Sequence, residues 1–169
     1  MQSNSKILTL DELLALRQSW KTQAKTVVWT NGCFDLLHAG HVRSFREAKA
    51  LGDILVVGIN SDSSVKAIKG GLRPVVPAED RAEVVAAMEA VDYVTIFDEP
   101  DPVNILARVR PDIHCKGAEY ASGQRPVPER DLVLSYGGEI RFLPLHQGRS
   151  TTGLIERICA AALEDACTK

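Results

Sequence analysis

Two histidines three positions apart, His38 and His41, enclose a glycine in the segment His38-Ala39-Gly40-His41. The segment follows an apolar, β-branched run at 26–30 and leads into a helix-like run that begins at His41. Residues three apart face the same side of a helix, so both imidazoles would lie at its first turn. Free backbone N–H groups there attract anions, and imidazole N–H groups add further donors. The spacing predicts a phosphate site in which the histidines stabilise charge that develops during transfer.

Two other interpretations of the histidines stay open on these residues alone. The pair could be a capping histidine beside a surface histidine, or it could form a metal-binding module together with Cys33. Asn31 and Gly32 before the turn, and the helix after it, favour the phosphate site. Cys33 has no neighbouring base in the sequence that would make its thiol a nucleophile. The four cysteines show no Cys-x-x-Cys pair, so we expect neither structural zinc nor a disulfide framework.

Composition and charge restrict the class of protein. The 169 residues are 45% hydrophobic and 25% charged, which suits one soluble domain with its own core. A formal net charge of -2 offers no electrostatic footprint for nucleic acid. No apolar run is long enough to span a bilayer, and no charged-then-apolar leader opens the chain, so we expect a cytoplasmic protein without a membrane partner.

Helical and strand-like patterns alternate along the chain and must position these groups. We predict strands over 26–30, 54–59, 93–97, 112–115 and 139–143. Helices are expected over 8–20, 41–51, 103–109 and 129–136, after Pro77, and from about residue 152, with a loop at 66–71 after a short helix. We expect the first helix to pack against the outside of the sheet, the helix after Pro77 to bury Val84 and Val85, and the last helix to carry an apolar face. The alternation predicts an α/β fold with a doubly wound, five-stranded parallel sheet. Residues 1–169 would form a single domain, of which 1–24 is an N-terminal helical extension.

Polar segments follow four of the five predicted strands, at 31–41, 60–62, 116–120 and 148–152. The carboxyl ends of parallel strands meet at one edge of the sheet, and ligands bind beyond that edge. We therefore expect these segments to build one site.

Short polar side chains in these segments are candidates for ligand contact. Ser150 and Thr151 open the last helix, where hydroxyls and free N–H groups could hold phosphate or serve only as an N-cap. Asn60 and Asp62 follow a strand, and the alternative to a ligand contact there is a turn.

Basic side chains supply candidate phosphate cations. Lys69 and Arg81 are the candidates. Arg suits bidentate phosphate contact, and Lys acts as a point charge. Lys66 and Arg73 compete for the same role, and a solvated surface charge is the alternative for each of the four.

Taken together, these segments resemble the HxGH nucleotidyltransferase superfamily and, within it, the heptose 1-phosphate adenylyltransferases. The resemblance rests on 31–35 with 38–41, 58–62, 73–75, Arg81, 116–120 and 150–152, and it covers nearly the whole chain. It implies a Rossmann-like nucleotidyltransferase fold and transfer of AMP from ATP to D-glycero-β-D-manno-heptose 1-phosphate. The products would be pyrophosphate and ADP-heptose for lipopolysaccharide core or related heptose-glycan synthesis. Many members are fused to a kinase domain, and we expect the stand-alone form here.

The resemblance also implies partners and residue roles. Mg²⁺ would accompany ATP with no protein residue assigned as its ligand, and the chain would form a homo-oligomer. Segment 116–120 would contact the base, with Tyr120 stacked on adenine, and loop 121–128 would contact the sugar or close over it. The implied catalytic residues are His38, His41, Lys69, Ser150 and Thr151. The implied binding residues are Asn31, Gly32, Cys33, Phe34, Gly40, Asn60, Asp62, Arg81, Lys116, Gly117, Glu119, Tyr120 and Arg149.

Three positions depart from what is common among relatives. Glu119 stands where Asp is frequent, and Gly153 stands where a longer polar residue is frequent. The glycerol-3-phosphate cytidylyltransferases place an Arg earlier in the turn before the Ser-Thr pair, whereas here Arg149 directly precedes Ser150. A cytidylyltransferase of a polyol or sugar phosphate and a non-catalytic nucleotide-binding module remain the alternatives.

Overall fold

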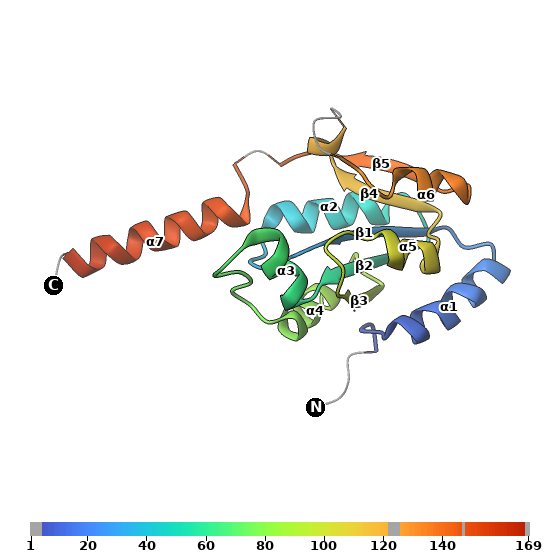
Figure 1. The fold of residues 1–169 in the computed structure, drawn as a ribbon, viewed down its shortest axis with the longest axis horizontal. Coiled ribbons are helices and arrows are strands. Elements are labelled where there is room, and N and C mark those ends of the chain that lie inside the picture. Colours follow the sequence, from blue (N-terminus) through green and yellow to red (C-terminus); the bar gives the residue numbers. More distant parts are fainter. Residues whose placement is uncertain (1–4, 122–125, 147, 168–169) are drawn as a thin grey trace.

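The computed structural model describes residues 5–121, 126–146 and 148–167. Five parallel strands form one sheet in the order β3-β2-β1-β4-β5, as Figure 1 shows. The strands are β1 (Val27–Gly32), β2 (Ile54–Asn60), β3 (Tyr93–Phe97), β4 (Ile113–Gly117) and β5 (Glu139–Leu143). The predicted doubly wound α/β sheet is therefore confirmed, and three of its strand starts, those of β2, β3 and β5, fall where the sequence places them.

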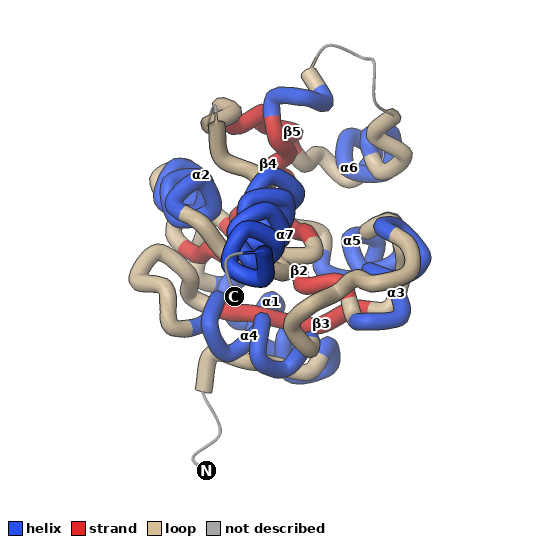
Figure 2. Tube along the Cα trace, turned by 90° about the vertical axis from the view of Figure 1, so that its left-hand side faces the viewer, coloured by secondary structure: helices blue, strands red, loops and turns tan. Residues whose placement is uncertain are grey.

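Helices cover both faces of the sheet. They are α1 (Leu10–Thr22), α2 (Ala39–Lys49), α3 (Asp62–Lys69), α4 (Ala78–Ala86), α5 (Val103–Val109), α6 (Arg130–Ser135) and α7 (Thr151–Cys167), with a 3₁₀ turn η1 (Ala118–Tyr120). One core cluster joins α2 and α4 to the sheet, and a second joins α1, α5 and α6 to the opposite face. Figure 2 shows α2 and α5 on opposite sides of the strands.

Strand β2 is buried on both faces, as its continuous apolar run predicts. Leu55 and Val57 belong to the α2–α4 core, whereas Val56 between them belongs to the α1–α5–α6 core. Gly58 allows the neighbouring strand to pack closely, because a Cβ there would lie 2.3 Å from the Trp29 indole.

The N-terminal segment is tied to the edge of the sheet. Leu8 N donates to the Val94 carbonyl and Val94 N donates to the Lys6 carbonyl, both at 2.8 Å. Helix α1 then begins at Leu10, two residues later than predicted, because Thr9 and Glu12 form a capping box. Leu13 and Trp20 are buried against the α5 side of the sheet, which confirms that α1 packs outside it.

Two sequence predictions in the middle of the chain are wrong. Residues 66–69 belong to α3 rather than to a loop, because Ser61 caps a helix that begins at Asp62. Val84 is 49% exposed rather than buried. Helix α4 turns Arg81, Ala82 and Val85 towards the sheet, which leaves Val84 on the solvent side.

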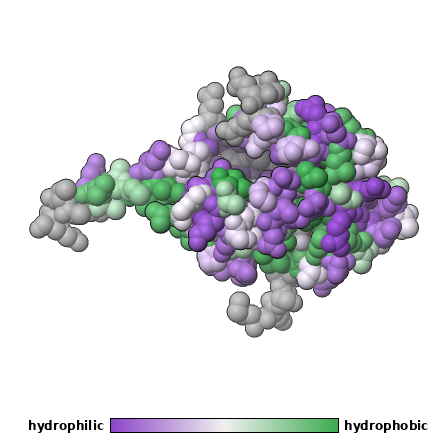
Figure 3. Space-filling view, viewed as in Figure 1, coloured by the Kyte–Doolittle hydropathy of each residue, from purple (hydrophilic) through white to green (hydrophobic). Residues whose placement is uncertain are grey.

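Helix α7 extends away from the body of the domain (Figure 1), and hydrophobic side chains line it in Figure 3. Its predicted apolar face is largely exposed: Ile158 is 55% and Leu163 68% exposed. Thr151 Oγ1 anchors its start by donating to the Leu36 carbonyl at 3.0 Å. Across the described residues, no helix has the length and apolar character needed to cross a membrane.

Candidate active site

The four polar segments lie at one edge of the sheet. They follow β1, β2, β4 and β5, and all four strands run parallel, so their carboxyl ends share an edge. Strand β1 lies between β2 and β4, and the chain winds outwards from it in both directions. This reversal of strand order is where open α/β sheets bind ligands. The predicted convergence of the segments is confirmed.

The two histidines form the first turn of α2. The helix begins at Ala39, so His38 is its N-cap and His41 its third residue. His38 Nδ1 accepts from Gly40 N at 3.1 Å, and His38 N donates to His41 Nδ1 at 3.3 Å. This reciprocal cap stacks the two rings with their centroids 3.9 Å apart and their planes 23° apart. The predicted pairing of the imidazoles is confirmed.

These hydrogen bonds decide what the histidines can do. Because each Nδ1 accepts a hydrogen bond, each neutral ring carries its proton on Nε2. Burial and the neighbouring His38 lower the pKa of His41 to about 4. Burial, then the charges of Arg149 and His146, also lower the pKa of His38. At neutral pH both side chains are therefore uncharged N–H donors, and neither has a free ring nitrogen to act as a base.

Aromatic and glycine packing holds the histidine turn. Phe34 meets His41 edge-on, with centroids 5.6 Å apart, and packs on Phe45 at 5.1 Å. Its ring also covers Gly32, where a Cβ would lie 3.2 Å from it. A Cβ on Gly40 would lie 2.8 Å from His38 Nδ1. Phe34, Gly32 and Gly40 thus support the turn.

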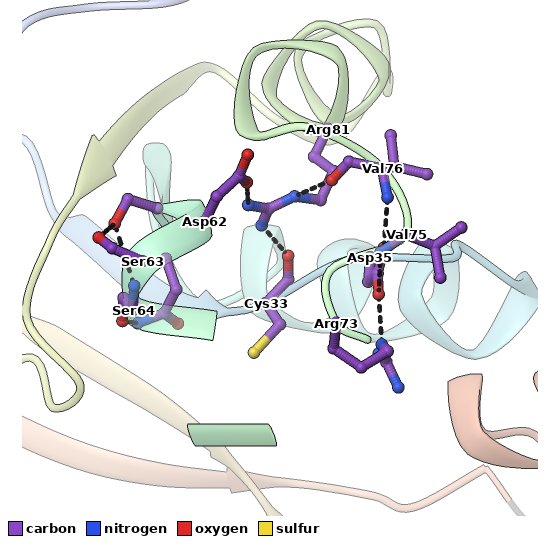
Figure 4. A network of polar contacts seen from close by, with 11 residues as sticks. Cys33, Asp35, Asp62, Ser63, Ser64, Arg73, Val75, Val76 and Arg81 are labelled. Atoms are coloured by element: carbon purple, nitrogen blue, oxygen red, sulfur yellow. Dashed lines mark hydrogen bonds and ion pairs between the residues drawn. The ribbon is translucent and has the colours of Figure 1, made fainter. Parts of the chain in front are cut away.

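Asp35 pins a distant loop against the same turn (Figure 4). Its carboxylate accepts from Arg73 Nε at 2.5 Å and from the N–H groups of Val75 and Val76, each at 2.9 Å. Burial alone would raise the pKa of Asp35, but these donors outweigh it and lower the pKa. Arg73 is therefore engaged by a buried anion.

Arg81 braces the turn from α4. Its side chain is buried; Nη2 donates to Asp62 Oδ1 at 2.7 Å, Nε donates to the Val76 carbonyl at 2.9 Å, and Nη1 donates to the Cys33 carbonyl (Figure 4). The predicted role as an open phosphate cation does not match this burial. Through these hydrogen bonds, Arg81 on α4 connects that helix to α3 and to the segment after β1.

Asn31 and Asn60 are also engaged within the protein. Asn60 Nδ2 donates to Ser64 Oγ at 2.8 Å and to the Glu99 carbonyl at 3.1 Å, which uses both of its N–H groups. Asn31 Oδ1 accepts from the Trp29 indole at 3.2 Å. Both side-chain amides therefore fix strand ends. In each amide, at least one polar atom is already used in a hydrogen bond within the protein.

Lys69 is a cation at the C-terminal end of α3 that remains exposed to solvent. It has no ion-pair partner among the described residues. Its charge reaches Cys33, although burial still raises the pKa of that thiol. Cys33 stays protonated, which agrees with the expectation that it is no nucleophile. Lys66, one turn earlier, lines a separate surface hollow with Arg73 and Leu72.

The start of α7 faces the histidine turn. Ser150 Oγ accepts from Gly153 N at 3.0 Å, so Ser150 is the N-cap and Gly153 does not prevent capping. The position that a Cβ on Gly40 would occupy lies 3.5 Å from Arg149 Cβ. A pocket between the two segments is lined by His38, Gly148, Arg149, Ser150, Leu154 and Arg157.

Segment 116–120 forms the other end of the site. Lys116 Nζ lies 2.7 Å from Glu129 Oε1 and 4.4 Å from the centroid of the Tyr120 ring. The Glu119 carboxylate folds back over Gly117, where a Cβ would lie 2.0 Å from Glu119 Oε2. That oxygen is buried and has no hydrogen-bond partner in the described parts of the chain. Of the predicted sugar-side loop 121–128, residues 122–125 lie outside the described residues.

Comparison with known proteins identifies the family. Residues 29–148 match the family model described as cytidylyltransferase-like, from β1 to the turn before α7. The chain belongs to the cytidylyltransferase-like family. The match spans the histidine turn, the Asp35 and Arg81 network and the Lys116 segment, and so most of the site residues described above.

Curated relatives of this cytidylyltransferase-like chain are longer proteins. The bifunctional protein HldE of Pelobacter propionicus is 46% identical over 92% of this chain and 32% of the relative. HldE of Magnetococcus marinus is 49% identical over 83% of this chain and 28% of the relative. The chain thus spans about a third of the length of the curated relatives it matches.

Solved structures support the same fold. A lipopolysaccharide core biosynthesis protein from Thermoplasma volcanium superposes with a TM-score of 0.59 at 25% identity, covering 74% of this chain and 99% of that chain. The pantoate–β-alanine ligase of Francisella tularensis also gives a TM-score of 0.59, at 16% identity. At this identity the comparison supports the fold alone.

Sequence reasoning missed three residues of the cytidylyltransferase-like site. Arg157 lines the His38 pocket because it lies about two turns into α7, beyond the Ser-Thr pair that marked the helix start. Glu129 and His114 are buried behind Lys116. In the sequence, Glu129 opens the predicted helix 129–136 and His114 lies within a predicted strand, and only the fold brings the two side chains together.

Proposed function

We propose that this chain transfers AMP from ATP to D-glycero-β-D-manno-heptose 1-phosphate, releasing pyrophosphate and forming ADP-heptose. The observation that carries the proposal is the stacked pair of His38 and His41, in which each Nδ1 accepts a hydrogen bond and leaves the proton on Nε2. His38 also lines the pocket with Arg149 and Ser150. The motif resemblance supports the choice of substrates. The 42–49% identity to HldE proteins over most of the chain agrees with it.

The reaction is a single displacement at phosphorus. A phosphate oxygen of the sugar 1-phosphate attacks the α-phosphorus of ATP, and the bond from that phosphorus to the bridging oxygen of the β-phosphate breaks. Pyrophosphate leaves with both electrons of that bond, so no covalent enzyme intermediate forms. The protein need only align the two phosphates and stabilise charge, which neutral N–H donors and fixed cations do without proton transfer.

Residues around the triphosphate divide this work. The histidine Nε2–H groups donate to α- and β-phosphate oxygens as charge moves towards the leaving group. Arg149, Lys69 and the start of α7 hold the β- and γ-phosphates, since a capped helix N-terminus still has free N–H groups. Arg81 and Asp35 act behind them, because their contacts keep the histidine turn in place.

We also propose that Mg²⁺ enters with ATP and is held by its phosphate oxygens. The carboxylates of Asp35 and Asp62 face Arg73 and Arg81. In the part of the chain that the structure describes, no group of three or more His, Cys, Asp or Glu side chains could hold a metal ion. When bound, Mg²⁺ would neutralise charge on the phosphates.

The base and the sugar are assigned to the other end of the rim. Segment 116–120 would contact adenine, with Tyr120 stacking on it, and residues 121–128 would approach the sugar. We propose a cytoplasmic location, where ATP is available for sugar activation. A homo-oligomer is the proposed assembly, and the exposed apolar side chains of α7 are suited to it.

The test is a panel of ATP or CTP with heptose 1-phosphate or glycerol 3-phosphate, with pyrophosphate release as the measurement. We expect release only with ATP and heptose 1-phosphate. Release only with CTP would replace this assignment by a cytidylyltransferase.

A second arm separates the enzyme from a non-catalytic nucleotide-binding module. Replacing both histidines by Ala should lower turnover by about two orders of magnitude or more, while ATP affinity falls less. A wild-type protein that binds ATP but transfers AMP to no acceptor would favour the module.

A further inference from the structure

A buried carboxylate lies behind the proposed base-side segment. Glu129 directly precedes α6 and is fully buried. Its Oε1 accepts from two side chains of β4, His114 Nε2 at 2.9 Å and Lys116 Nζ at 2.7 Å. These two residues are two apart on a strand, so both project from one face of the sheet. Helix α6 packs on that face, which brings the carboxylate to both.

The Glu129 carboxylate is charged where it lies. Burial alone would raise its pKa, but the hydrogen bonds from His114 and Lys116 outweigh burial and bring the pKa to about 2. Burial lowers the pKa of His114, which therefore donates as a neutral ring. Lys116 is the cation that balances Glu129, because a buried anion without such a partner is strongly destabilising.

Lys116 connects this anion to the Tyr120 ring. The Lys116 side chain is only 12% exposed, and its ammonium lies over the ring at a cation–π distance, 4.4 Å from the centroid. A lysine side chain is otherwise flexible, and Glu129 fixes its far end. The ring of Tyr120 therefore rests on a cation that is itself held by a buried anion.

We propose that Glu129 is a positioning residue of the nucleotide site, which acts through Lys116 to hold the Tyr120 ring at the carboxyl end of β4. The inference rests on the proposed function, in which segment 116–120 contacts the base. Lys116 then acts where the base binds, and the triphosphate is bound by His38, His41 and Arg149 at the opposite end of the sheet edge.

The test compares a ligand that has a base with one that lacks it. Glu129→Gln keeps the size of the side chain and removes its charge. We expect the Kd for ATP to rise about fivefold, the loss that a weakened cation–π support implies. The Kd for inorganic tripolyphosphate should change by less than about twofold, because its contacts lie across the rim.

Variants of Lys116 test whether Glu129 affects ATP binding through this lysine. Lys116→Met should weaken ATP binding as much as Glu129→Gln does, and the double variant should be no weaker than Lys116→Met, because both changes break one chain of contacts. Lys116→Arg keeps a cation over Tyr120 and a donor to Glu129, so it should bind ATP close to the wild-type value. The matched control is Glu139→Gln, the same change at an exposed ion pair with Arg141 on β5.

Circular dichroism and thermal unfolding check that each variant folds. The double variant carries the test if a single variant does not fold, because it leaves neither Glu129 nor Lys116 as an unpaired charge. Unchanged ATP affinity in Lys116→Met, parallel loss of ATP and tripolyphosphate affinity, or no ATP binding by the wild type would each overturn the proposal. A wild-type protein that binds ATP without transferring AMP contradicts the proposed function only. The selective loss of ATP affinity would then still support the role of Glu129.

Discussion

The backbone N–H of Gly40 donates to Nδ1 of His38 at 3.1 Å, and a Cβ on Gly40 would lie 2.8 Å from the same nitrogen. The hydrogen bond that fixes the His38 tautomer therefore needs a residue without a side chain two positions later. Gly40 therefore contributes to the geometry of the site, since the absence of a side chain lets the His38 ring pack over the first turn of α2.

Replacing Gly40 by Ala should lower turnover more than it lowers ATP affinity. The new methyl group would push the His38 ring off its acceptor position and away from the transferred phosphate. We expect kcat to fall by about tenfold or more, as for the loss of one oriented donor. Gly71→Ala is the matched control, because a Cβ there meets no atom within 4 Å. Equal kinetics in the two variants would contradict this role of Gly40.

His41 should make the protein less stable in acid. Its pKa is about 4 in the folded state and about 6.5 when unfolded. The unfolded chain therefore binds the proton first as pH falls, so stability present above pH 6.5 is lost between about 6.5 and 4. The loss amounts to about 3 kcal/mol at most.

Denaturant unfolding of the wild type and of His41→Gln at pH 7 and pH 4 measures this contribution. The stability of the wild type relative to the variant should fall between the two pH values, because only the wild type carries the imidazole. A relative stability that stays constant or rises as pH falls would show that His41 is not held neutral.

Arg81→Gln should destabilise the fold by about 3 kcal/mol, since it removes the buried guanidinium that pairs with the half-exposed Asp62 and leaves the Cys33 and Val76 carbonyls without a donor. Arg108→Gln is the control, because Arg108 pairs with Asp11 at the surface, and it should cost less than about 1 kcal/mol. Chemical denaturation measures both values. If Arg81 instead served mainly as a phosphate cation, ATP affinity would fall while stability stayed near the wild-type value.

The thiols should differ in their reaction with iodoacetamide. Cys159 is exposed, whereas burial raises the pKa of Cys33 and raises that of Cys115 to about 12. The thiolate is the reactive form, so Cys159 should be alkylated before Cys33 at pH 8, and Cys115 only after unfolding. Mass spectrometry of timed digests gives the order. Early alkylation of Cys33 would indicate an activated thiol beside the histidines.

The placement of the main elements followed from local patterns. The run Ile54–Ile59 is apolar at every position, and only a strand covered on both faces buries such a run, so β2 was predictable. The start of α2 was placed two residues late, because the helical pattern was counted from His41, whereas His38 caps a helix that begins at Ala39. Val84 was misplaced since consecutive valines look equally apolar, and only packing of α4 decides which one faces the sheet.

By itself, the sequence determined the parallel α/β sheet, the four polar segments at its carboxyl edge and the pairing of His38 with His41, because these depend on local periodicity and strand direction. The tertiary structure alone decided how the polar side chains are used. Arg81 and Asn60 are turned inwards, and Glu129 reaches His114 and Lys116 from another element. Hydrogen bonds between residues far apart in the chain depend on distances that no local pattern contains.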